Sequence, residues 1–266
     1  MDSADSPDLG RGVLHPARAA ELISVERLAP DAAVARFVEY YWLVRWDLHG
    51  LPSYEQKVLA HPNVHLVFEA PRARVYGVDR SLFVRRLVGA GHVLGVKFRP
   101  GAFRPFAGRP VSALADRSVP AVEFFGPAAD RLDAALLGGE GADPAALADA
   151  FLLPRLPAPD PVADEVAAMV ERITGSPDLC RVDDLAAEFG LGVRRLQRLF
   201  AEYVGASPKW VLRRARLHEA AERASGGGEF DLAALAAELG YADQAHLTRD
   251  FTAVVGEPPA RYAAAG

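Results

Sequence analysis

The chain has little cysteine, no long apolar run and no excess of positive charge. Its single cysteine, Cys180, excludes an intramolecular disulfide and a metal site built from several thiolates. No apolar stretch approaches the roughly 18 residues that a membrane-spanning helix needs. Of the 266 residues, 50% are hydrophobic and 24% are charged, a balance typical of soluble globular proteins. We therefore expect a cytoplasmic protein with no membrane contact.

The negative net charge limits any nucleic-acid function to local clusters of cations. The formal charge is −5, and the residues from 160 onward, with seventeen acidic and twelve basic side chains, carry all of it. A protein that binds a polyanion over its whole surface would be basic. Binding to nucleic acid therefore has to depend on a local arrangement of side chains.

A proline-rich stretch divides the chain. PRLPAPDP, at 154–161, has four prolines in eight residues, which is typical of a stiff, extended linker. We expect a loose acidic tail over 1–19, with no secretory signal, and a regulatory domain over 20–153. A linker over 154–160 then leads into a helical domain over 161–266.

The part before the linker is expected to be rich in β-strands. Six short runs carry aromatic and β-branched residues between turn signals, namely RFVEYYWLVRWDL, EQKVLA, NVHLVFEA, ARVYGV, SLFVRRLV and HVLGVKFRP. Their close spacing favours an antiparallel sheet that closes into a barrel or sandwich. Short helices are expected from there to Leu137.

An internal repeat is the most informative feature after the linker. LAAEFG at 185–190 recurs as LAAELG at 235–240, fifty residues later. Beyond the glycine the offset becomes 51, so that Arg198 matches Arg249. The second copy thus has one extra residue in the turn after its glycine.

Each copy predicts a helix-turn-helix unit. Asp183 and Asp231 lie near a helix start, where acidic side chains cap free amides. Gly190 and Gly240 are expected to end the first helix, because glycine readily takes the left-handed conformation of a helix C-cap. The second helix of such a unit can lie in the major groove of DNA.

The second helices, expected over about 193–203 and 243–254, carry polar side chains on their outer faces. Arginine can bind guanine O6 and N7 with two hydrogen bonds, and glutamine can bind adenine N6 and N7 in the same way. A solvated charged face is the alternative for a single helix of this composition, and the repeated unit argues against it. The candidate base-reading residues are Arg194, Gln197, Arg198, Gln244, His246 and Arg249.

A long helix is expected between the two units, with Ser207 as its N-cap and Pro208 at its first position. It would hold the units at a fixed separation, so that their second helices enter successive major grooves about 34 Å apart. Candidate phosphate contacts are Arg195, Arg213 and Arg214. For the two arginines on the long helix, pairing with nearby carboxylates is the alternative.

The C-terminal part resembles the DNA-binding domain of AraC/XylS-type bacterial transcription regulators. The resemblance rests on LAAEFGLGVRRLQRLFAEYVGASPKWVLRRARLHEA and, more specifically, on GYADQAHLTRDFTAVVGEPPARY. Leu247 stands where this family usually has phenylalanine, and Gly192 stands where it often has a capping serine. The resemblance implies double-stranded DNA as the partner and places the six candidate base-reading residues at the family's DNA-facing positions.

The N-terminal part resembles a domain of unknown function that often precedes such DNA-binding domains, through YYWLVRW, GVKFRPGAF and LADRSVP. By analogy with other regulators of this type, its form would be a cupin-like barrel. The expected fold class is therefore α+β, with a β-rich domain followed by an all-α domain of two helix-turn-helix units. The architecture implies effector sensing or dimerisation, and it allows contact with RNA polymerase; no cofactor is expected.

Two other functions remain open from the sequence. His61, His65 and Glu69 are spaced by four, which on a strand would place them on one face, as in a cupin-like metal-dependent enzyme. The usual His-x-His pair is absent, and Pro62 interrupts the strand. Alternatively, the helix-turn-helix units could contact a protein in a co-regulator. A DNA-binding regulator without enzymatic activity accounts for more of the sequence than either.

Overall fold

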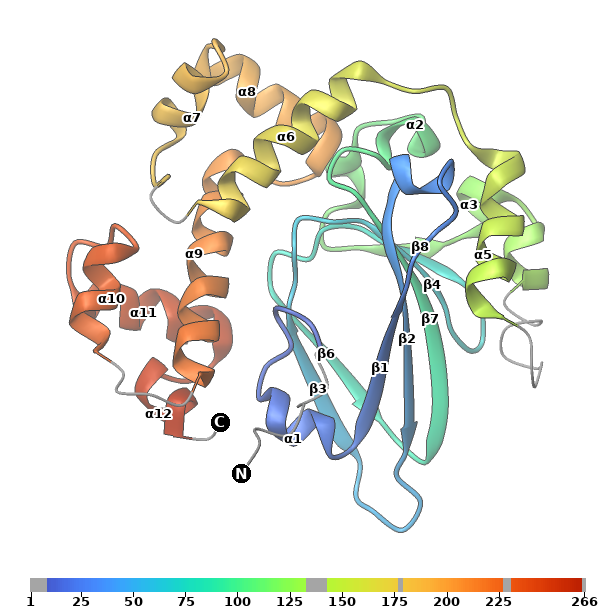
Figure 1. Cartoon of the computed structure of the whole chain (residues 1–266), viewed down its shortest axis with the longest axis horizontal. Helices are drawn as coiled ribbons and strands as arrows, with labels where there is room; N and C mark the ends of the chain where they lie inside the picture. The colour runs from blue at the N-terminus through green and yellow to red at the C-terminus, as the bar shows by residue number, and fades with distance from the viewer. Residues whose placement is uncertain (1–8, 133–142, 177–178, 227–230, 265–266) are drawn as a thin grey trace.

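The chain folds into a β-rich N-terminal part followed by a helical C-terminal part (Figure 1). The computed structural model describes residues 9–132, 143–176, 179–226 and 231–264. All strands lie between Ile23 and Pro120, and the described residues from Pro144 onward form helices and turns. This arrangement confirms the α+β class expected from the sequence.

Eight strands make up the N-terminal part, and each of the six strand-like runs in the sequence contains one. The first and last strands were not anticipated, because ISVERL has three charged or polar residues and SVP is only three residues long. The strands are β1 (Ile23–Leu28), β2 (Val38–Asp47), β3 (Tyr54–Leu59), β4 (His65–Phe68), β5 (Arg74–Tyr76), β6 (Leu82–Leu87), β7 (Ala90–Phe98) and β8 (Ser118–Pro120).

The strands form two antiparallel sheets. Six of them hydrogen-bond in the order β1-β2-β7-β4-β5-β8, and β3 pairs with β6 in a separate ribbon. The antiparallel pairing agrees with the sequence-based expectation. A closed barrel needs every strand paired on both sides, whereas β1 and β8 are edges of the larger sheet. Among the described residues there is accordingly no closed barrel of the cupin-like kind.

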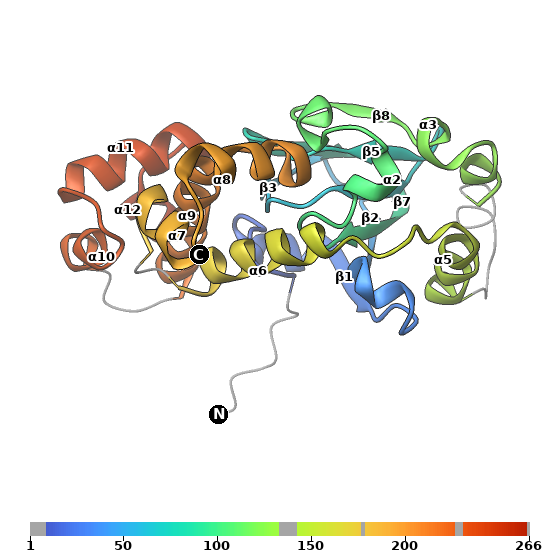
Figure 2. The same ribbon diagram turned by 90° about the horizontal axis from the view of Figure 1, so that it is seen from above.

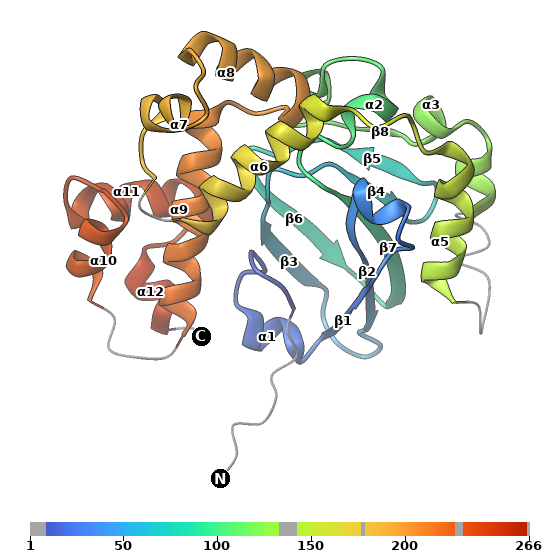
Figure 3. The ribbon, with the colours of Figure 1, turned by 45° about the horizontal axis from the view of Figure 1, so that its top comes forward.

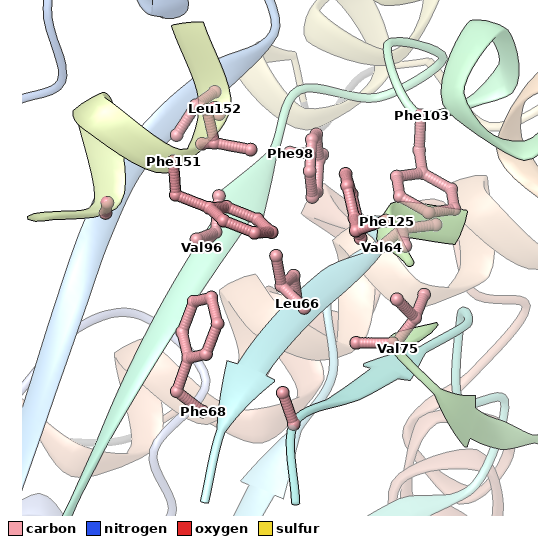
Figure 4. Packing of buried hydrophobic residues seen from close by; sticks show 14 of the residues in the cluster. Val64, Leu66, Phe68, Val75, Val96, Phe98, Phe103, Phe125, Phe151 and Leu152 are labelled. Atoms are coloured by element: carbon pink, nitrogen blue, oxygen red, sulfur yellow. The ribbon is translucent and has the colours of Figure 1, made fainter. Parts of the chain in front are cut away.

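The main hydrophobic core lies on one face of the six-stranded sheet. Helices α2 (Arg104–Ala107), α3 (Val122–Phe125) and α5 (Pro144–Leu152) supply aromatic side chains to it (Figure 4). Phe68 of β4 packs edge-on against Phe151 of α5, with ring centroids 5.9 Å apart. These helices therefore cover this face of the sheet. The opposite face remains available for contact with other parts of the chain.

The segment that precedes the first strand is ordered from residue 9, which differs from the loose tail expected over 1–19. Its backbone joins β3, since the Leu14 amide donates to Lys57 O (3.0 Å) and the Leu59 amide donates to Gly12 O (2.8 Å). Helix α1 (Pro16–Ala20) follows, and Leu14 is buried against the helical part. Apolar contacts with residues far along the chain therefore order this segment despite its polar composition. Residues 1–8 of the expected tail lie outside the described residues.

The helical part begins with α6 (Pro161–Gly175), after a stretch at 156–160 without regular secondary structure. Of the linker expected over 154–160, the first two residues belong to the short 3-10 helix Leu153–Arg155. The first repeat forms α7 (Val182–Glu188) and α8 (Val193–Leu199), which continues as a π-helical turn at Phe200–Val204. The remaining helices are α9 (Pro208–Ser225), α10 (Leu232–Glu238), α11 (Gln244–Val255) and α12 (Pro259–Ala264).

The two parts share hydrophobic clusters. Leu14 and Leu59 of the N-terminal part pack with Leu217 of α9, and Val78 packs in the cluster that contains Val166 of α6. Ion pairs such as Arg11–Glu219 (2.7 Å) lie beside these contacts. Helix α9 therefore serves both as the connection between the two repeats and as the surface that faces the N-terminal part.

Candidate nucleic-acid interface

The turn between α7 and α8 is set by Gly190, which has a φ of 63°. The Gly190 amide donates to Ala187 O (3.1 Å), and the Leu191 amide donates to Ala186 O (2.8 Å). This is the Schellman pattern, in which a left-handed residue lets the last free carbonyls of a helix find donors. The chain can then turn directly into α8.

The second repeat builds the same turn from Gly240, whose φ is 67°. The Gly240 amide donates to Ala237 O (3.1 Å), and the Tyr241 amide donates to Ala236 O (2.9 Å). The extra residue of this copy is accommodated before α11, where the Asp243 carboxylate accepts from the His246 amide (2.6 Å). Both glycine C-caps predicted from the repeat are therefore confirmed.

Helix starts differ between the copies. Asp231 caps α10 by accepting from the amides of Ala233 and Ala234 (2.9 and 3.0 Å). Asp183, expected to act similarly, lies inside the first turn of α7 and makes no capping hydrogen bond, because the N-cap position is Arg181. Asp183 therefore lies near the helix start as predicted, but its capping role is wrong.

Helix α8 presents a basic outer face. Its inner face is fixed by Leu196 and Phe200, both fully buried. The opposite face carries Arg194, Arg195, Gln197 and Arg198. All four side chains are exposed, and none makes a hydrogen bond or ion pair within the described part of the chain. Three guanidinium groups and an amide are thus held on one helix face, without a hydrogen-bond or ion-pair partner among the described residues.

Helix α11 is less basic but has the same division. Leu247 and Phe251 are fully buried on its inner face. Gln244, His246 and Arg249 are exposed on the outer face. The His246 ring also packs edge-on against Tyr241, with centroids 5.1 Å apart, which orients the imidazole beside the turn.

Helices α8 and α11 lie along the same edge of the helical part, with α7 and α10 set behind them (Figure 2). Between them runs α9, whose N-terminus is capped by Ser207 Oγ accepting from the Trp210 amide (3.2 Å). The predicted long helix, its cap and the proline at its first position are all confirmed, and the helix spans Pro208–Ser225. The two units are therefore joined by one continuous helix.

Residues 185–265, which contain both units except the first three residues of α7, match a family described as a helix-turn-helix domain. The C-terminal part of this chain is an AraC-type helix-turn-helix domain. Residues 26–120, which contain all eight strands except the first three residues of β1, match a domain of unknown function, DUF6597. Both matches agree with the resemblances found in the sequence.

Solved structures show weaker similarity. The C-terminal domain of AraT, a response regulator from Geobacillus stearothermophilus, is 21% identical over 40% of this chain and 87% of its own, with a TM-score of 0.35. ToxT from Vibrio cholerae is 9% identical over 91% of this chain and 97% of its own, with a TM-score of 0.43. No curated protein matches the chain. The function therefore has to be argued from the AraC-type domain and its surfaces.

Two candidate phosphate contacts are engaged inside the protein. Arg213 of the AraC-type domain forms an ion pair with Asp250 (2.6 Å), the carboxylate pairing considered as the alternative. Arg214 is only 2% exposed and donates to the backbone carbonyl of Arg80 (2.8 Å) in the N-terminal part. Burial lowers the pKa of Arg214 to about 10. Arg214 cannot reach a phosphate in this arrangement, and of the three candidates only Arg195 is exposed and unpaired in the described part.

The Arg213 pair belongs to a network that the sequence did not reveal. Asp250 also accepts from the Tyr241 hydroxyl (2.9 Å), so one carboxylate ties α11 to α9 and to its own turn. Burial alone would raise the pKa of Asp250, but the hydrogen bonds from Arg213 and Tyr241 hold it below its usual value. The opposite charges of Arg213 and Asp250 were visible in the sequence, but their distance was not.

The three residues considered as cupin-like metal ligands have separate partners. The ring of His61 stacks on His218, His65 accepts from Trp42 Nε1 (3.2 Å), and Glu69 forms an ion pair with Arg85 (2.7 Å). Strand β4 covers only His65 to Phe68, so the shared strand face assumed from the spacing does not exist. No three metal-ligating side chains come together anywhere in the described residues. None of the described helices is both long enough and apolar enough to cross a membrane.

Proposed function

We propose that this protein is a sequence-specific, DNA-binding transcription regulator in which α8 and α11 enter successive major grooves on one side of the duplex. The observation that carries the proposal is the repeated unit, whose two second helices lie along one edge and expose polar side chains. The AraC-type domain contains two helix-turn-helix units, and the continuous helix α9 joins α8 to the second unit.

In this proposal the two helices read bases differently. Arg194 and Arg198, one helical turn apart on α8, suit guanine, and Gln197 between them suits adenine. On α11, Gln244 and His246 offer amide and imidazole groups, and Arg249 supplies the one fixed positive charge. Arg195 lies at the edge of the α8 face and suits a phosphate contact.

The negative net charge of the chain supports a large contribution of α8 to DNA affinity. With a net charge of −5, affinity cannot come from a general attraction to DNA, so specific contacts on α8 have to supply much of it. We further propose that the N-terminal part regulates these contacts, because it holds α9 through Arg214 and two shared hydrophobic clusters. The same proposal assigns self-association and contact with RNA polymerase to surfaces outside α8 and α11.

Selection of bound sequences from random duplex DNA, with the full chain, tests the proposal. The full chain is needed because Leu14 and Leu59 contribute to the core beneath α9. The expected result is an asymmetric site with two base clusters about 10 bp apart. A single cluster would remove the base-reading role of α11, and no enrichment at low salt would refute DNA recognition as a whole.

Arg198→Ala then tests the placement of α8 in the groove. Loss of a two-pronged contact should weaken binding to the selected site by about 1–3 kcal/mol and relax the preference at one base position. Arg18→Ala, at an exposed arginine of α1 that pairs with Glu21, serves as the matched control and should leave both unchanged. Equal behaviour of the two variants would contradict the major-groove placement.

A further inference from the structure

Two histidine rings, one from each part of the protein, stack on each other where the parts meet. His61 follows β3 in the N-terminal part, and His218 lies near the middle of α9. Their ring centroids are 4.0 Å apart, and the ring planes are 17° apart. Figure 3 shows α9 lying alongside the strands of the N-terminal part, so the pair spans the boundary. A change in the charge of these rings therefore acts directly on the contact between the two parts.

The surroundings of His218 favour its neutral ring. The side chain is 4% exposed, and a Cβ atom at Gly12 would lie 2.9 Å from His218 Cε1. Neither ring nitrogen makes a hydrogen bond of normal geometry within the described residues, and the Ala60 backbone raises its pKa only weakly. A protonated ring has two N–H donors. Since both would be buried without a good acceptor, protonation in place costs free energy.

His61 is also held in its neutral form. Its ring is half-buried, and Nε2 lies 2.9 Å from Arg11 O, a carbonyl that can only accept, so Nε2 carries the proton of the neutral ring. Burial and the positive charge of Lys97 lower the pKa of His61 to about 3. Burial, the neighbouring His61 and Arg214 lower the pKa of His218 well below its usual value. Both rings are therefore neutral at physiological pH while the two parts are in contact.

The carboxylates near the pair are already occupied by cations. Glu39 pairs with Lys97 (3.0 Å), and Glu171 pairs with Arg99 (3.8 Å). Arg11 pairs with both Glu219 and Glu222 (2.7 and 2.8 Å). The charges that act on the pKa of the two rings are accordingly all positive. The ionisable side chains that face this region are Arg11, Arg27, Glu39, Tyr40, Lys97, Arg99, Glu171, Arg214, Glu219, Glu222 and Tyr262.

We propose that the His61–His218 stack is a pH-sensitive latch, which keeps the two parts docked while both rings are neutral and releases them when the rings take up protons. Protonation in the docked arrangement would place two imidazolium rings face to face, beside Arg11, Lys97 and Arg214. After separation each ring is in water, which solvates its positive charge. The free energy of docking therefore depends on pH.

The direction of this dependence follows from the number of protons bound. The docked arrangement binds fewer protons than the separated one, because docking lowers the pKa of both rings. Docking is thus favoured above the ordinary histidine pKa of about 6.5 and weakens as the pH falls below it. Each histidine lowers the docking equilibrium constant by about tenfold per pH unit in that range, and the pair lowers it by about a hundredfold.

His15 lies at the same boundary but responds in the opposite direction. Its Nε2 is 2.7 Å from Glu257 Oε1, and its ring packs against Tyr262 of α12 with centroids 4.7 Å apart. A protonated His15 faces a carboxylate, so its charge holds the two parts together. Both members of this ion pair are partly exposed, and such pairs contribute little to stability. Release at low pH therefore depends on the more deeply enclosed His61–His218 stack.

The position of the latch on α9 connects it to DNA binding, a step that rests on the proposed function. Helix α9 joins the unit that contains α8 to the unit that contains α11. Release of the N-terminal part frees this connecting helix. Whenever docking changes the affinity for DNA, proton uptake by the latch must change that affinity as well, because the two equilibria are linked.

Fluorescence energy transfer across the boundary tests the latch without DNA. The two dyes are attached at Ala90→Cys in β7 and Ala237→Cys in α10, both exposed positions, in a full chain that also carries Cys180→Ala. We expect transfer to fall as the pH is lowered from about 7.5 to about 4.5, while the far-UV circular dichroism stays constant. Constant transfer over this range would overturn the proposal, and so would a fall that occurs only together with loss of secondary structure.

Matched glutamine variants identify the groups that take up the protons. Glutamine retains hydrogen-bonding groups but does not titrate, so the double variant His61→Gln, His218→Gln should show transfer that is independent of pH. His49→Gln is the control, because His49 is exposed and pairs with Asp47 away from the boundary. It should respond as the chain with all its histidines does. Equal responses of the double variant and the control would overturn the proposal.

Proton uptake by the chain that keeps both rings covers the case in which the double variant is separated at every pH. The docking equilibrium above a pH of about 5, where carboxylates remain charged, should correspond to uptake of between one and two protons on release. Release without proton uptake would overturn the proposal. A working latch in a protein that selects no DNA sequence would refute only the proposed function, and DNA selection without release at low pH would refute only the latch.

Discussion

Substitution of the two turn glycines by alanine tests the helix-turn-helix geometry with a control supplied by the internal repeat. Gly190 and Gly240 have nearly equal φ values of 63° and 67°, so a Cβ atom introduces the same backbone strain at both. That strain costs an L-residue about 1–2 kcal/mol. The surroundings differ, because a Cβ at Gly190 would meet no atom within 4 Å, whereas one at Gly240 would lie 2.4 Å from Cys180 Sγ.

The expected losses of stability follow from these distances. Gly190→Ala should lower the free energy of unfolding by about 1–2 kcal/mol, from backbone strain alone. Gly240→Ala should lower the free energy of unfolding by about 1–3 kcal/mol more than Gly190→Ala does, because the Cys180 side chain has to be displaced. Urea unfolding of the full chain, followed by circular dichroism, measures both variants under the same conditions.

Removal of the sulfur atom completes the test. In the Cys180→Ala background, Gly240→Ala should cost little more than Gly190→Ala does, because most of the crowding is gone. Equal losses for the two glycine variants in the presence of Cys180 would refute the packing of this thiol against the second turn. Losses near zero for both would refute the left-handed glycine C-caps themselves.

Three further predictions concern a helix cap, an ion pair and a buried arginine of the helical part. Asp231→Ala should lower stability by about 0.5–2 kcal/mol in urea unfolding, whereas Asp183→Ala should have little effect, since only Asp231 accepts capping hydrogen bonds; equal losses would contradict the caps. Asp250→Asn should destabilise the protein at neutral pH. The difference in unfolding free energy from the unaltered chain should disappear as the pH falls below about 4, because Asp250, with its lowered pKa, stabilises the fold only while its carboxylate is charged. A difference independent of pH would exclude the ion pair as its cause. Arg214→Met should destabilise the chain by about 1–3 kcal/mol through two unsatisfied carbonyls. The salt dependence of its DNA binding should be unchanged, and a slope reduced by about one would restore Arg214 as a phosphate contact.

The helix-turn-helix units could be predicted from the sequence because their determinants are local. A left-handed glycine, a capping serine and an apolar stripe act within a few residues along the chain, and the repeat presents the glycine and the stripe twice. The exposure of Arg194 and Arg198 followed from the helical period once Leu196 was assigned to the buried side. The same reasoning identified six strands from their residue types, although not the order in which they pair.

Only the tertiary structure decided which side chains are free. Arg213 and Arg214 are neighbours on one helix, yet the first pairs with Asp250 and the second points into the N-terminal part. Their partners lie 37 and 134 residues away in sequence, and no periodicity or propensity carries information about such distances. The same holds for the open six-stranded sheet, the ordered segment before β1 and the stacking of His61 on His218. Each depends on how two distant surfaces pack, a global free-energy balance that local sequence patterns do not encode.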